Sequence, residues 1–155
     1  MLVEKVMSTH LITVDKEETV AAAARLLSRH NIGALPVTSS DGRLVGMLTD
    51  RDIAVRCVAA NFDPNITRVR TIMSSSPVTV HAGASAAEAA KKMSKHRICR
   101  MPVTEQGKMV GLISQGDFAA VADSSAEAAL AFLEVSGSHD SGEPYQTGHQ
   151  NRNYR

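Results

Sequence analysis

The feature that most constrains this fold is an internal repeat, in which the first half of the chain returns in the same order in the second half. The offset is 66 residues at first, and 65 after one residue is lost in a turn. The matching segments are 6–9 with 72–75, 12–14 with 78–80, 32–38 with 98–104, and 44–52 with 109–117. A chain of 155 residues can form one domain or two small repeats that share a core, so we expect two halves that fold alike.

Each repeat shows the same order of predicted elements. Val20, Ala23, Ala24 and Leu27 are spaced as one apolar face of a helix, which predicts a helix over 19–30. A short extended piece precedes this helix, and a strand, a turn, a second strand and a second helix follow it. The spans predicted for these pieces are 12–14, 35–38, 40–42, 44–49 and 50–60. Each repeat is therefore a β-α-β-β-α unit, and the predicted fold class is α+β, with helices and strands mixed in both halves.

The two copies also set the predicted domain organisation. We assign 1–60 to the first repeat, 61–71 to a linker, 72–122 to the second repeat and 123–155 to a C-terminal segment. That segment is predicted to contain a helix at 126–135. After Ser136 we expect a flexible polar tail, because the sequence there lacks apolar residues to bury.

Composition and charge argue against several classes of function. A net charge of +1 and an aromatic content of 3% do not suit a nucleic-acid binder, which usually carries a basic patch or a stacking surface. Glu4 interrupts the N-terminal apolar stretch, and no apolar run approaches the roughly 20 residues of a membrane span. We therefore expect a cytoplasmic protein without a membrane partner. Cys57 and Cys99 are too few for a disulfide framework and are expected to be buried free thiols.

Two pairs of equivalent polar residues mark the ends of the predicted helices. Thr19 and Ser85 stand just before the apolar runs of equivalent helices, which predicts that they are N-caps. His30 and His96 stand at the other ends, where a histidine meets the carbonyl end of the helix dipole favourably. A structural role is therefore favoured for both histidines over metal ligation.

One motif, GMLTDRD at 46–52, joins a buried strand to a polar helix start. Its hydroxyl and carboxylates fall where free backbone N–H groups point outward, which predicts that Thr49 or Asp50 caps the helix. The same pattern of glycine, two apolar residues, hydroxyl and aspartate returns at 111–117. This repetition favours a binding role for the motif in addition to the cap.

These features together resemble a tandem pair of cystathionine-β-synthase (CBS) domains, also called a Bateman module. The resemblance covers about residues 3–120 and rests on 6–7, 33–37 and 46–52, with their second copies at 72–73, 99–103 and 111–117. The loop at 61–65 is further similar to that of small stand-alone CBS-pair proteins, including the hypoxic-response type. The resemblance implies two repeats packed with pseudo-two-fold symmetry, two clefts between them and a disc-like homodimer.

Members of this family bind adenosine-containing ligands in the clefts: AMP, ADP, ATP and sometimes S-adenosylmethionine. The resemblance implies that Asp52 and Asp117 accept hydrogen bonds from ribose hydroxyls, in charge-assisted bonds that are stronger than neutral ones. Thr49 and Ser114 would add hydroxyl contacts, and the starts of the following helices would favour phosphate. The adenine slots are expected from Thr13, Val14, Leu35 and Pro36 in one repeat, and from Thr79, Val80, Met101 and Pro102 in the other.

Phosphate groups also need cations, and here the repeats differ. Arg51 lies inside the first motif, where the second copy has Gly116. Arg100 lies where the first copy has Ala34, and family members often carry a basic residue at the place of Arg100. Both arginines are candidate phosphate ligands, with a solvated surface position as the alternative, and Ala34 is placed in the site by the same correspondence. The two clefts are thus expected to be chemically unlike, and occupancy of the second cleft is left open.

The sequence contains no nucleophile–base arrangement, so no catalytic residues are predicted. The histidines near the C-terminus, His139 and His149, have no companion ligands at metal spacing, and no metal or cofactor other than the nucleotide is expected. The leading hypothesis is a non-catalytic regulatory homodimer that binds an adenine nucleotide and reports cell energy state to an unknown partner protein. The alternatives are an enzyme acting on nucleotides, a structural dimer with degenerate sites, and a sensor of S-adenosylmethionine or an NAD-type ligand.

Overall fold

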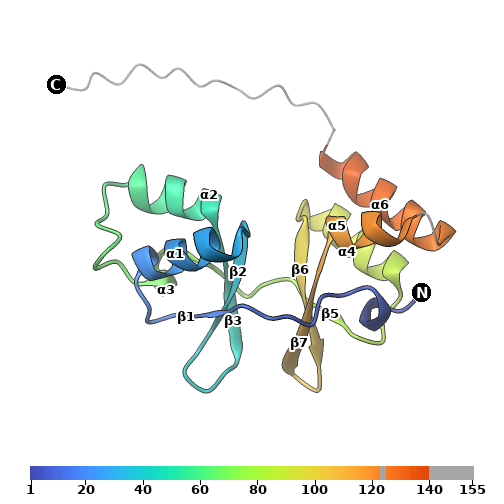
Figure 1. Ribbon diagram of the computed structural model, residues 1–155, viewed down its shortest axis with the longest axis horizontal. Helices are drawn as coiled ribbons and strands as arrows, with labels where there is room; N and C mark the ends of the chain where they lie inside the picture. The colour runs from blue at the N-terminus through green and yellow to red at the C-terminus, as the bar shows by residue number, and fades with distance from the viewer. Residues whose placement is uncertain (123–124, 140–155) are drawn as a thin grey trace, which may run out of the picture.

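The computed structural model describes residues 1–122 and 125–139, and it consists of two lobes that each combine a small sheet with helices (Figure 1). The sheets lie toward the middle of the molecule, and the helices lie toward its two ends. The fold class predicted from the repeat, α+β with two like halves, is confirmed.

Lobe 1 holds most of the first repeat. Its elements are β1 (Val14–Asp15), α1 (Val20–His30), β2 (Ala34–Thr38), β3 (Leu44–Thr49), α2 (Asp50–Asp52), η2 (Ile53–Val58), α3 (Val69–Ile72) and β4 (Ser74–Ser75). The sheet has the order β1-β2-β3-β4, with β1 parallel to β2 and the other pairs antiparallel. Gly42 adopts a φ of 80° in the turn between β2 and β3, as the Asp-Gly pair predicts. The apolar face of α1 buries Val20, Ala23 and Leu27.

Lobe 2 repeats this plan. Its elements are η1 (Val3–Lys5), β5 (Val80–His81), α4 (Ala86–His96), β6 (Arg100–Glu105), β7 (Lys108–Ser114), α5 (Gln115–Val121) and α6 (Ala126–His139). Leu35 pairs with Leu48 across the hairpin of lobe 1, and Met101 pairs with Ile113 at the equivalent place in lobe 2. All four side chains are fully buried. The correspondence between the repeats therefore extends to the register of their hairpins.

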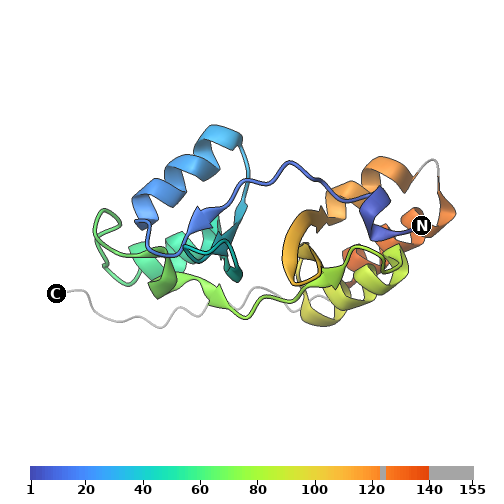
Figure 2. The same ribbon diagram turned by 90° about the horizontal axis from the view of Figure 1, so that it is seen from below.

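Each lobe takes its first segment from the other half of the chain. From the N-terminus, η1 packs on lobe 2, where Val3 and Val6 join the core and Ser8 forms a bridge with β7. At the start of the second repeat, α3 and β4 pack on lobe 1, where Val69 and Ile72 join the core. Figure 2 shows the two crossing segments on opposite sides of the molecule. No single cut in the chain would therefore separate the lobes.

The glycines of the repeated motif are explained by these crossings. A Cβ built on Gly46 would lie 2.7 Å from the carbonyl oxygen of Ser74, and one built on Gly111 would lie 3.2 Å from that of Ser8. A residue without a side chain lets another backbone approach a strand this closely. The motif thus fixes the packing of the crossing segment as well as the start of the following helix.

The first helix of each repeat begins and ends as predicted. Thr19 and Ser85 each accept a backbone N–H bond from the residue three positions ahead, at 3.2 and 3.1 Å. His30 and His96 are the last residues of α1 and α4. The caps satisfy N–H groups that the first turn of a helix leaves without a partner.

The second helix of the first repeat is shorter and less regular than predicted. After one turn, α2 continues as the π-helical segment η2, in which the N–H of Ala59 bonds to the carbonyl oxygen of Ala54 at 2.9 Å. The segment ends at Val58 rather than at 60. Periodicity of apolar residues cannot distinguish these two helix types over so few turns.

The C-terminal helix α6 ends at His139, which places Ser136 inside the helix rather than in the predicted tail. Its buried residues Ala128, Ala131 and Val135 are on the side that packs against α4 and α5. Gln115 at the start of α5 donates to the Ser136 hydroxyl at 2.6 Å. The remaining residues of the predicted flexible tail, 140–155 with His149, lie outside the described residues.

Neither cysteine forms a disulfide, as predicted. Cys57 is fully buried, whereas Cys99 is only partly buried because it borders a cleft between the lobes. In the part of the chain that the structure describes, no helix combines the length and the apolar character needed to cross a bilayer.

Candidate functional site

The polar end of the first motif forms a reciprocal helix cap. The N–H of Asp52 donates to Thr49 Oγ1 at 3.0 Å, and the N–H of Thr49 donates to Asp52 Oδ2 at 2.9 Å. The prediction of a cap at Thr49 is confirmed, and Asp52 rather than Asp50 supplies the second half of it. This cap holds both side chains in fixed positions at the junction of β3 and α2.

The cap uses only one of the two carboxylate oxygens of Asp52. The other oxygen, Oδ1, lies 3.7 Å from Arg56 Nε, and 15% of the Asp52 side chain is exposed. An ionised carboxylate offers about four lone-pair positions. Asp52 therefore retains acceptor capacity for hydroxyl groups of a ligand while it caps the helix.

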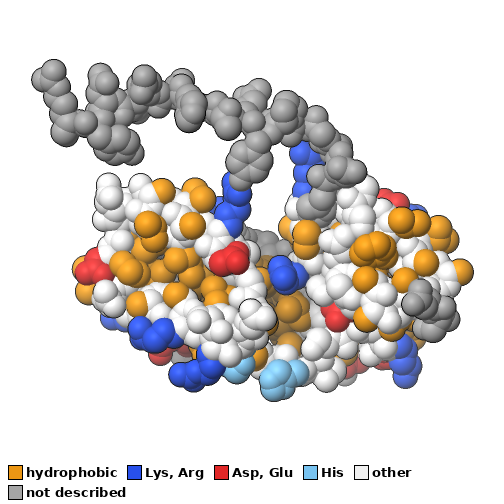
Figure 3. Space-filling view, turned by 45° about the horizontal axis from the view of Figure 1, so that its top comes forward, with side chains coloured by type: hydrophobic (Ala, Val, Ile, Leu, Met, Phe, Trp, Pro, Cys, Tyr) orange, Lys and Arg blue, Asp and Glu red, His pale blue; other side chains and the backbone are white. Residues whose placement is uncertain are grey.

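A cavity of about 520 Å³, which we call cleft 1, opens beside this cap between the two lobes. The motif lines it from lobe 1, the crossing segment after α3 lines a second side, and the start of β6 lines it from lobe 2. Its residues are Gly33, Ala34, Met47, Thr49, Asp50, Arg51, Asp52, Ser74, Ser75, Ser76, Pro77, Val78, Arg97, Ile98, Cys99, Arg100 and Pro102. Its volume lies in the range of small-molecule sites. Figure 3 shows a hollow between the lobes with apolar side chains inside it and charged groups at its edge.

Cleft 1 has a mixed but predominantly basic lining. Arg51, Arg97 and Arg100 contribute three guanidinium groups, all on exposed residues, against the carboxylates of Asp50 and Asp52. Guanidinium groups match phosphate geometry, and a carboxylate matches a pair of hydroxyls. The cleft therefore has the groups needed to hold a molecule with a diol at one end and an anion at the other.

A smaller cavity of about 360 Å³, cleft 2, occupies the equivalent place on the other side of the pseudo-two-fold axis. Its residues are Ser8, His10, Leu11, Ile12, His30, Asn31, Ile32, Ala34, Pro36, Arg100 and Leu112. The second motif forms the same reciprocal cap, with the N–H of Ser114 donating to Asp117 Oδ2 at 2.7 Å. However, Ser114 and Asp117 are not among the described residues that line this cavity, so its lining differs from that of cleft 1, which includes Thr49 and Asp52.

The predicted site residues separate into three groups. Ala34, Thr49, Arg51, Asp52, Arg100 and Pro102 line cleft 1, while Ala34, Pro36 and Arg100 line cleft 2. Four others are buried in the lobe cores, with exposures of 3% or less: Val14, Leu35, Val80 and Met101. Their side chains belong to the hydrophobic cores of the two lobes, and the adenine slots that include them stay a prediction. The remaining residues, Thr13, Thr79, Ser114 and Asp117, line neither cleft.

Part of the lining of cleft 1 is not predicted from the sequence. Ser76, Pro77 and Val78 belong to the crossing segment, and Arg97 and Cys99 belong to the loop before β6. The repeat contains a signal for the first three, because their segment continues a matched stretch. Arg97 could be found only by knowing that the end of α4 faces the motif of the other repeat.

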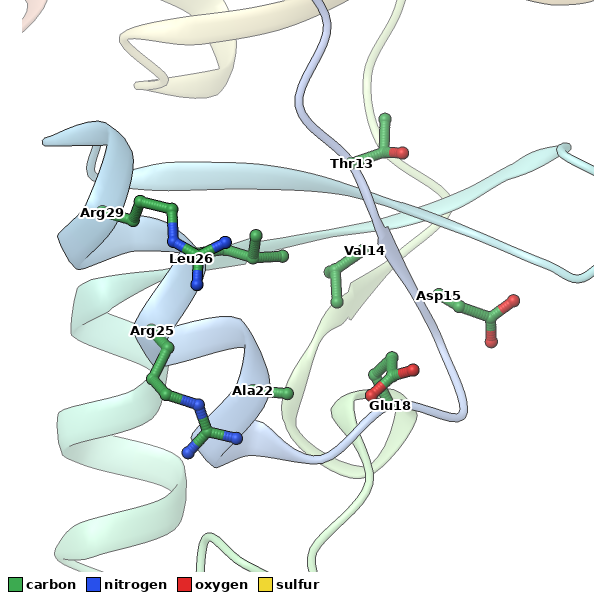
Figure 4. Close-up of a pocket in the computed structure, with 8 residues that line it drawn as sticks. All are labelled: Thr13, Val14, Asp15, Glu18, Ala22, Arg25, Leu26 and Arg29. Carbon is green, nitrogen blue, oxygen red and sulfur yellow. The ribbon is translucent and has the colours of Figure 1, made fainter.

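A further cavity of about 390 Å³ lies on lobe 1 away from both clefts, between β1 and α1 (Figure 4). Val14, Ala22 and Leu26 form its apolar part, and Arg25 and Arg29 extend from α1 (Figure 4). Thr13, a predicted site residue, lines this cavity and not cleft 1. In the described ranges, no group of three or more histidine, cysteine or acidic residues is placed to hold a metal ion.

Comparison with known proteins identifies the family. The family model described as "CBS domain" matches the chain twice, at residues 3–58 and 69–124. Hypoxic response protein 1 of Mycobacterium tuberculosis is 39% identical over 114 residues, which are 74% of this chain and 80% of that protein. The CBS domain-containing protein YhcV of Bacillus subtilis is 38% identical over 134 residues, covering 86% and 94% of the two chains.

Solved structures agree with this assignment. The crystal structure of Hypoxic Response Protein I with two coordinated zinc ions is 36% identical, with a TM-score of 0.72, and the match covers 77% of this chain and 98% of that one. The CBS domain pair of protein MJ0100, in complex with 5′-methylthioadenosine and S-adenosyl-L-methionine, is 30% identical with a TM-score of 0.71, covering 80% and 97%. This chain therefore belongs to the CBS-domain family, as a tandem pair of CBS domains.

Proposed function

We propose that this protein is a non-catalytic regulatory module that binds an adenine nucleotide, AMP, ADP or ATP, in cleft 1. The observation that carries the proposal is that one cavity collects the Thr49–Asp52 cap of one repeat and three arginines drawn from both repeats. A ligand held by both repeats favours one arrangement of the lobes. It can shift that arrangement only by its difference in affinity for the two states.

The ligand pose follows from the chemistry of the lining. The Asp52 oxygen that the cap does not use accepts hydrogen bonds from the ribose hydroxyls, and Thr49 stays beside it as part of the cap. The phosphate lies toward the guanidinium groups, and the adenine ring lies against the apolar wall that includes Pro102 and Val78. Each group of the nucleotide thus meets a side chain of matching chemistry.

The arginines favour a nucleotide over an adenosine derivative that has no phosphate. The MJ0100 CBS pair was crystallised with 5′-methylthioadenosine and S-adenosylmethionine, neither of which carries a phosphate. Among the described lining residues of cleft 1, Arg51, Arg97 and Arg100 exceed the carboxylates of Asp50 and Asp52 by one charge, which suits an anion. An S-adenosylmethionine or NAD-type ligand remains the second candidate, supported by the same diol-binding cap.

An apolar surface on lobe 1 supports the proposal that the protein signals as a homodimer. Val55, Val58, Phe62 and Ile66 are between 47% and 75% exposed, which is unusual for large apolar side chains close together in the chain. On lobe 2, α6 packs against α4 and α5. We infer that a second copy of the chain covers the lobe 1 surface, and that the dimer passes the nucleotide state to a partner protein.

A ligand panel tests the function directly. Thermal unfolding of the full chain is followed with AMP, ADP, ATP, S-adenosylmethionine, NAD and adenosine, each up to millimolar concentration. A ligand present at 100 times its Kd stabilises the native state by about 2.7 kcal/mol, so a nucleotide should raise the Tm visibly. The nucleotides should raise the Tm more than adenosine does. No shift with any ligand would indicate a structural dimer with degenerate sites, and phosphate release from ATP would indicate an enzyme.

A further inference from the structure

Among the described residues, two side chains border both clefts: Ala34 and Arg100. They occupy the same position in the two repeats, at the first residue of β2 and of β6. The wall between the clefts therefore carries a methyl group from one repeat and a guanidinium group from the other. The Arg100 guanidinium thus lies between two cavities that are related by pseudo-symmetry.

The guanidinium of Arg100 rests on the side of cleft 1. A Cβ built on Gly33 would lie 3.8 Å from Arg100 Nη2 and 3.3 Å from Asp50 Oδ2, and both Gly33 and Asp50 line cleft 1 alone. Arg100 is exposed, and within the described residues its side chain forms no hydrogen bond or ion pair. It can therefore turn toward either cleft without breaking an existing bond.

The clefts depend on this cation to different degrees. Cleft 1 also has Arg51 and Arg97 in its lining. In cleft 2, Arg100 is the one Lys or Arg among the described lining residues, and the other basic side chains there are His10 and His30. An anion in cleft 2 therefore needs Arg100 more than an anion in cleft 1 does.

We propose that Arg100 is shared by the two clefts, so that a phosphate-bearing ligand in cleft 1 lowers the affinity of cleft 2 for a second one. This inference rests on the proposed function. A nucleotide in cleft 1 holds the guanidinium on its own side, and cleft 2 is then left without its strongest phosphate ligand. The coupling is reciprocal, because a free energy of interaction between two sites acts on both.

Comparing AMP with adenosine isolates the coupling through Arg100, because only AMP has a phosphate. A hydrogen bond to a charged group contributes about 1.5–3 kcal/mol, which corresponds to roughly 10- to 150-fold in affinity. AMP in cleft 1 should weaken AMP binding in cleft 2 by an amount of this order. Adenosine has no phosphate, so adenosine in cleft 1 should leave the adenosine affinity of cleft 2 unchanged.

The experiment is an NMR titration of the ¹⁵N-labelled full chain with AMP, in which each cleft has its own reporter. The amide of Ser76 reports cleft 1, and the amide of His10 reports cleft 2. The AMP affinity of cleft 2 is measured in the wild type, where AMP also fills cleft 1, and in Asp52→Asn, where cleft 1 binds AMP more weakly. Cleft 2 should bind AMP at least about 10-fold more tightly in Asp52→Asn. In proteins that also carry Arg100→Ala, this difference should vanish.

Arg97→Asn is the matched control. It removes an arginine that lines cleft 1 alone, and it introduces the residue found at the equivalent position, Asn31. Both residues adopt the left-handed conformation, with φ of 51° and 52°, which asparagine tolerates. Arg97→Asn should weaken AMP binding in cleft 1. The AMP affinity of cleft 2 should still change when Asp52 is replaced.

The outcomes separate the two proposals. Equal AMP affinity of cleft 2 in the wild type and Asp52→Asn overturns the sharing of Arg100, as does a coupling that survives Arg100→Ala or that adenosine reproduces. In each of these cases AMP still binds, and the proposed function stands. Absence of AMP-dependent shifts at both reporters in the wild type overturns the proposed function, and the sharing of Arg100 with it.

Discussion

Replacing Asp52 separates its structural role from its proposed role in binding. Asparagine keeps one carbonyl oxygen, which can accept the Thr49 N–H bond that Asp52 accepts at 2.9 Å. It loses the negative charge and the second acceptor oxygen, now 3.7 Å from Arg56. Asp52→Asn should therefore weaken AMP binding by the value of a charge-assisted bond, about 1.5–3 kcal/mol or roughly 10- to 150-fold. It should cost less than about 1 kcal/mol in stability, because the cap is kept.

Asp52→Ala removes both roles at once. It should weaken AMP binding at least as much and also cost a further 0.5–2 kcal/mol or so in stability, the usual cost of losing a helix cap. Isothermal titration calorimetry measures the binding, and urea unfolding measures the stability. Asp41→Asn, in the exposed turn between β2 and β3, is the charge-matched control that should leave AMP affinity unchanged. Equal AMP affinities of the wild type and Asp52→Asn would refute the proposed diol contact.

Three further predictions concern other parts of the molecule. Gly46→Ala should lower the stability by about 1–3 kcal/mol in urea unfolding, because the new Cβ would lie 2.7 Å from the Ser74 carbonyl oxygen; an unchanged midpoint would contradict the crossing geometry. Val58→Lys, on a residue that is 62% exposed at a helix end, should shift sedimentation equilibrium from dimer to monomer without unfolding; an unchanged dimer would exclude this surface as the interface. The Ser39 hydroxyl bond lowers the pKa of Asp41, so its stabilising effect is present above the ordinary aspartate pKa and lost as the pH falls through the lowered value. Ser39→Ala should raise the Asp41 pKa in an NMR titration, and an unchanged value would remove this bond as the cause.

The sequence was informative where a local rule decides the structure. Thr19 and Ser85 cap their helices because a hydroxyl before an apolar helical face has a nearby N–H group to accept from. The motif at 46–52 was read correctly as a strand running into a helix start, since glycine, apolar and polar positions have distinct preferences. Because the sequence repeats, the same predictions apply to the second half, and the hairpins of the two halves have equivalent registers.

The sequence was less informative where distant segments meet. Val3 and Val69 are ordinary apolar residues, and nothing local indicates that each joins the core of the other lobe. The resemblance implies that Val14 and Met101 belong to adenine slots, but it does not indicate that their side chains are buried in the lobe cores. Arg97 joins cleft 1 only through the packing of one repeat against the other. The fold could thus be predicted from the repeat, whereas the lining of the clefts required the arrangement of the lobes.

A crystal structure of the full chain with AMP would test the proposed binding site most directly. The proposed function predicts that the ribose hydroxyls lie within hydrogen-bonding distance of the Asp52 carboxylate in cleft 1, with the phosphate facing Arg51, Arg97 or Arg100. A sugar bound away from Asp52, or AMP bound outside the space between the lobes, would contradict it.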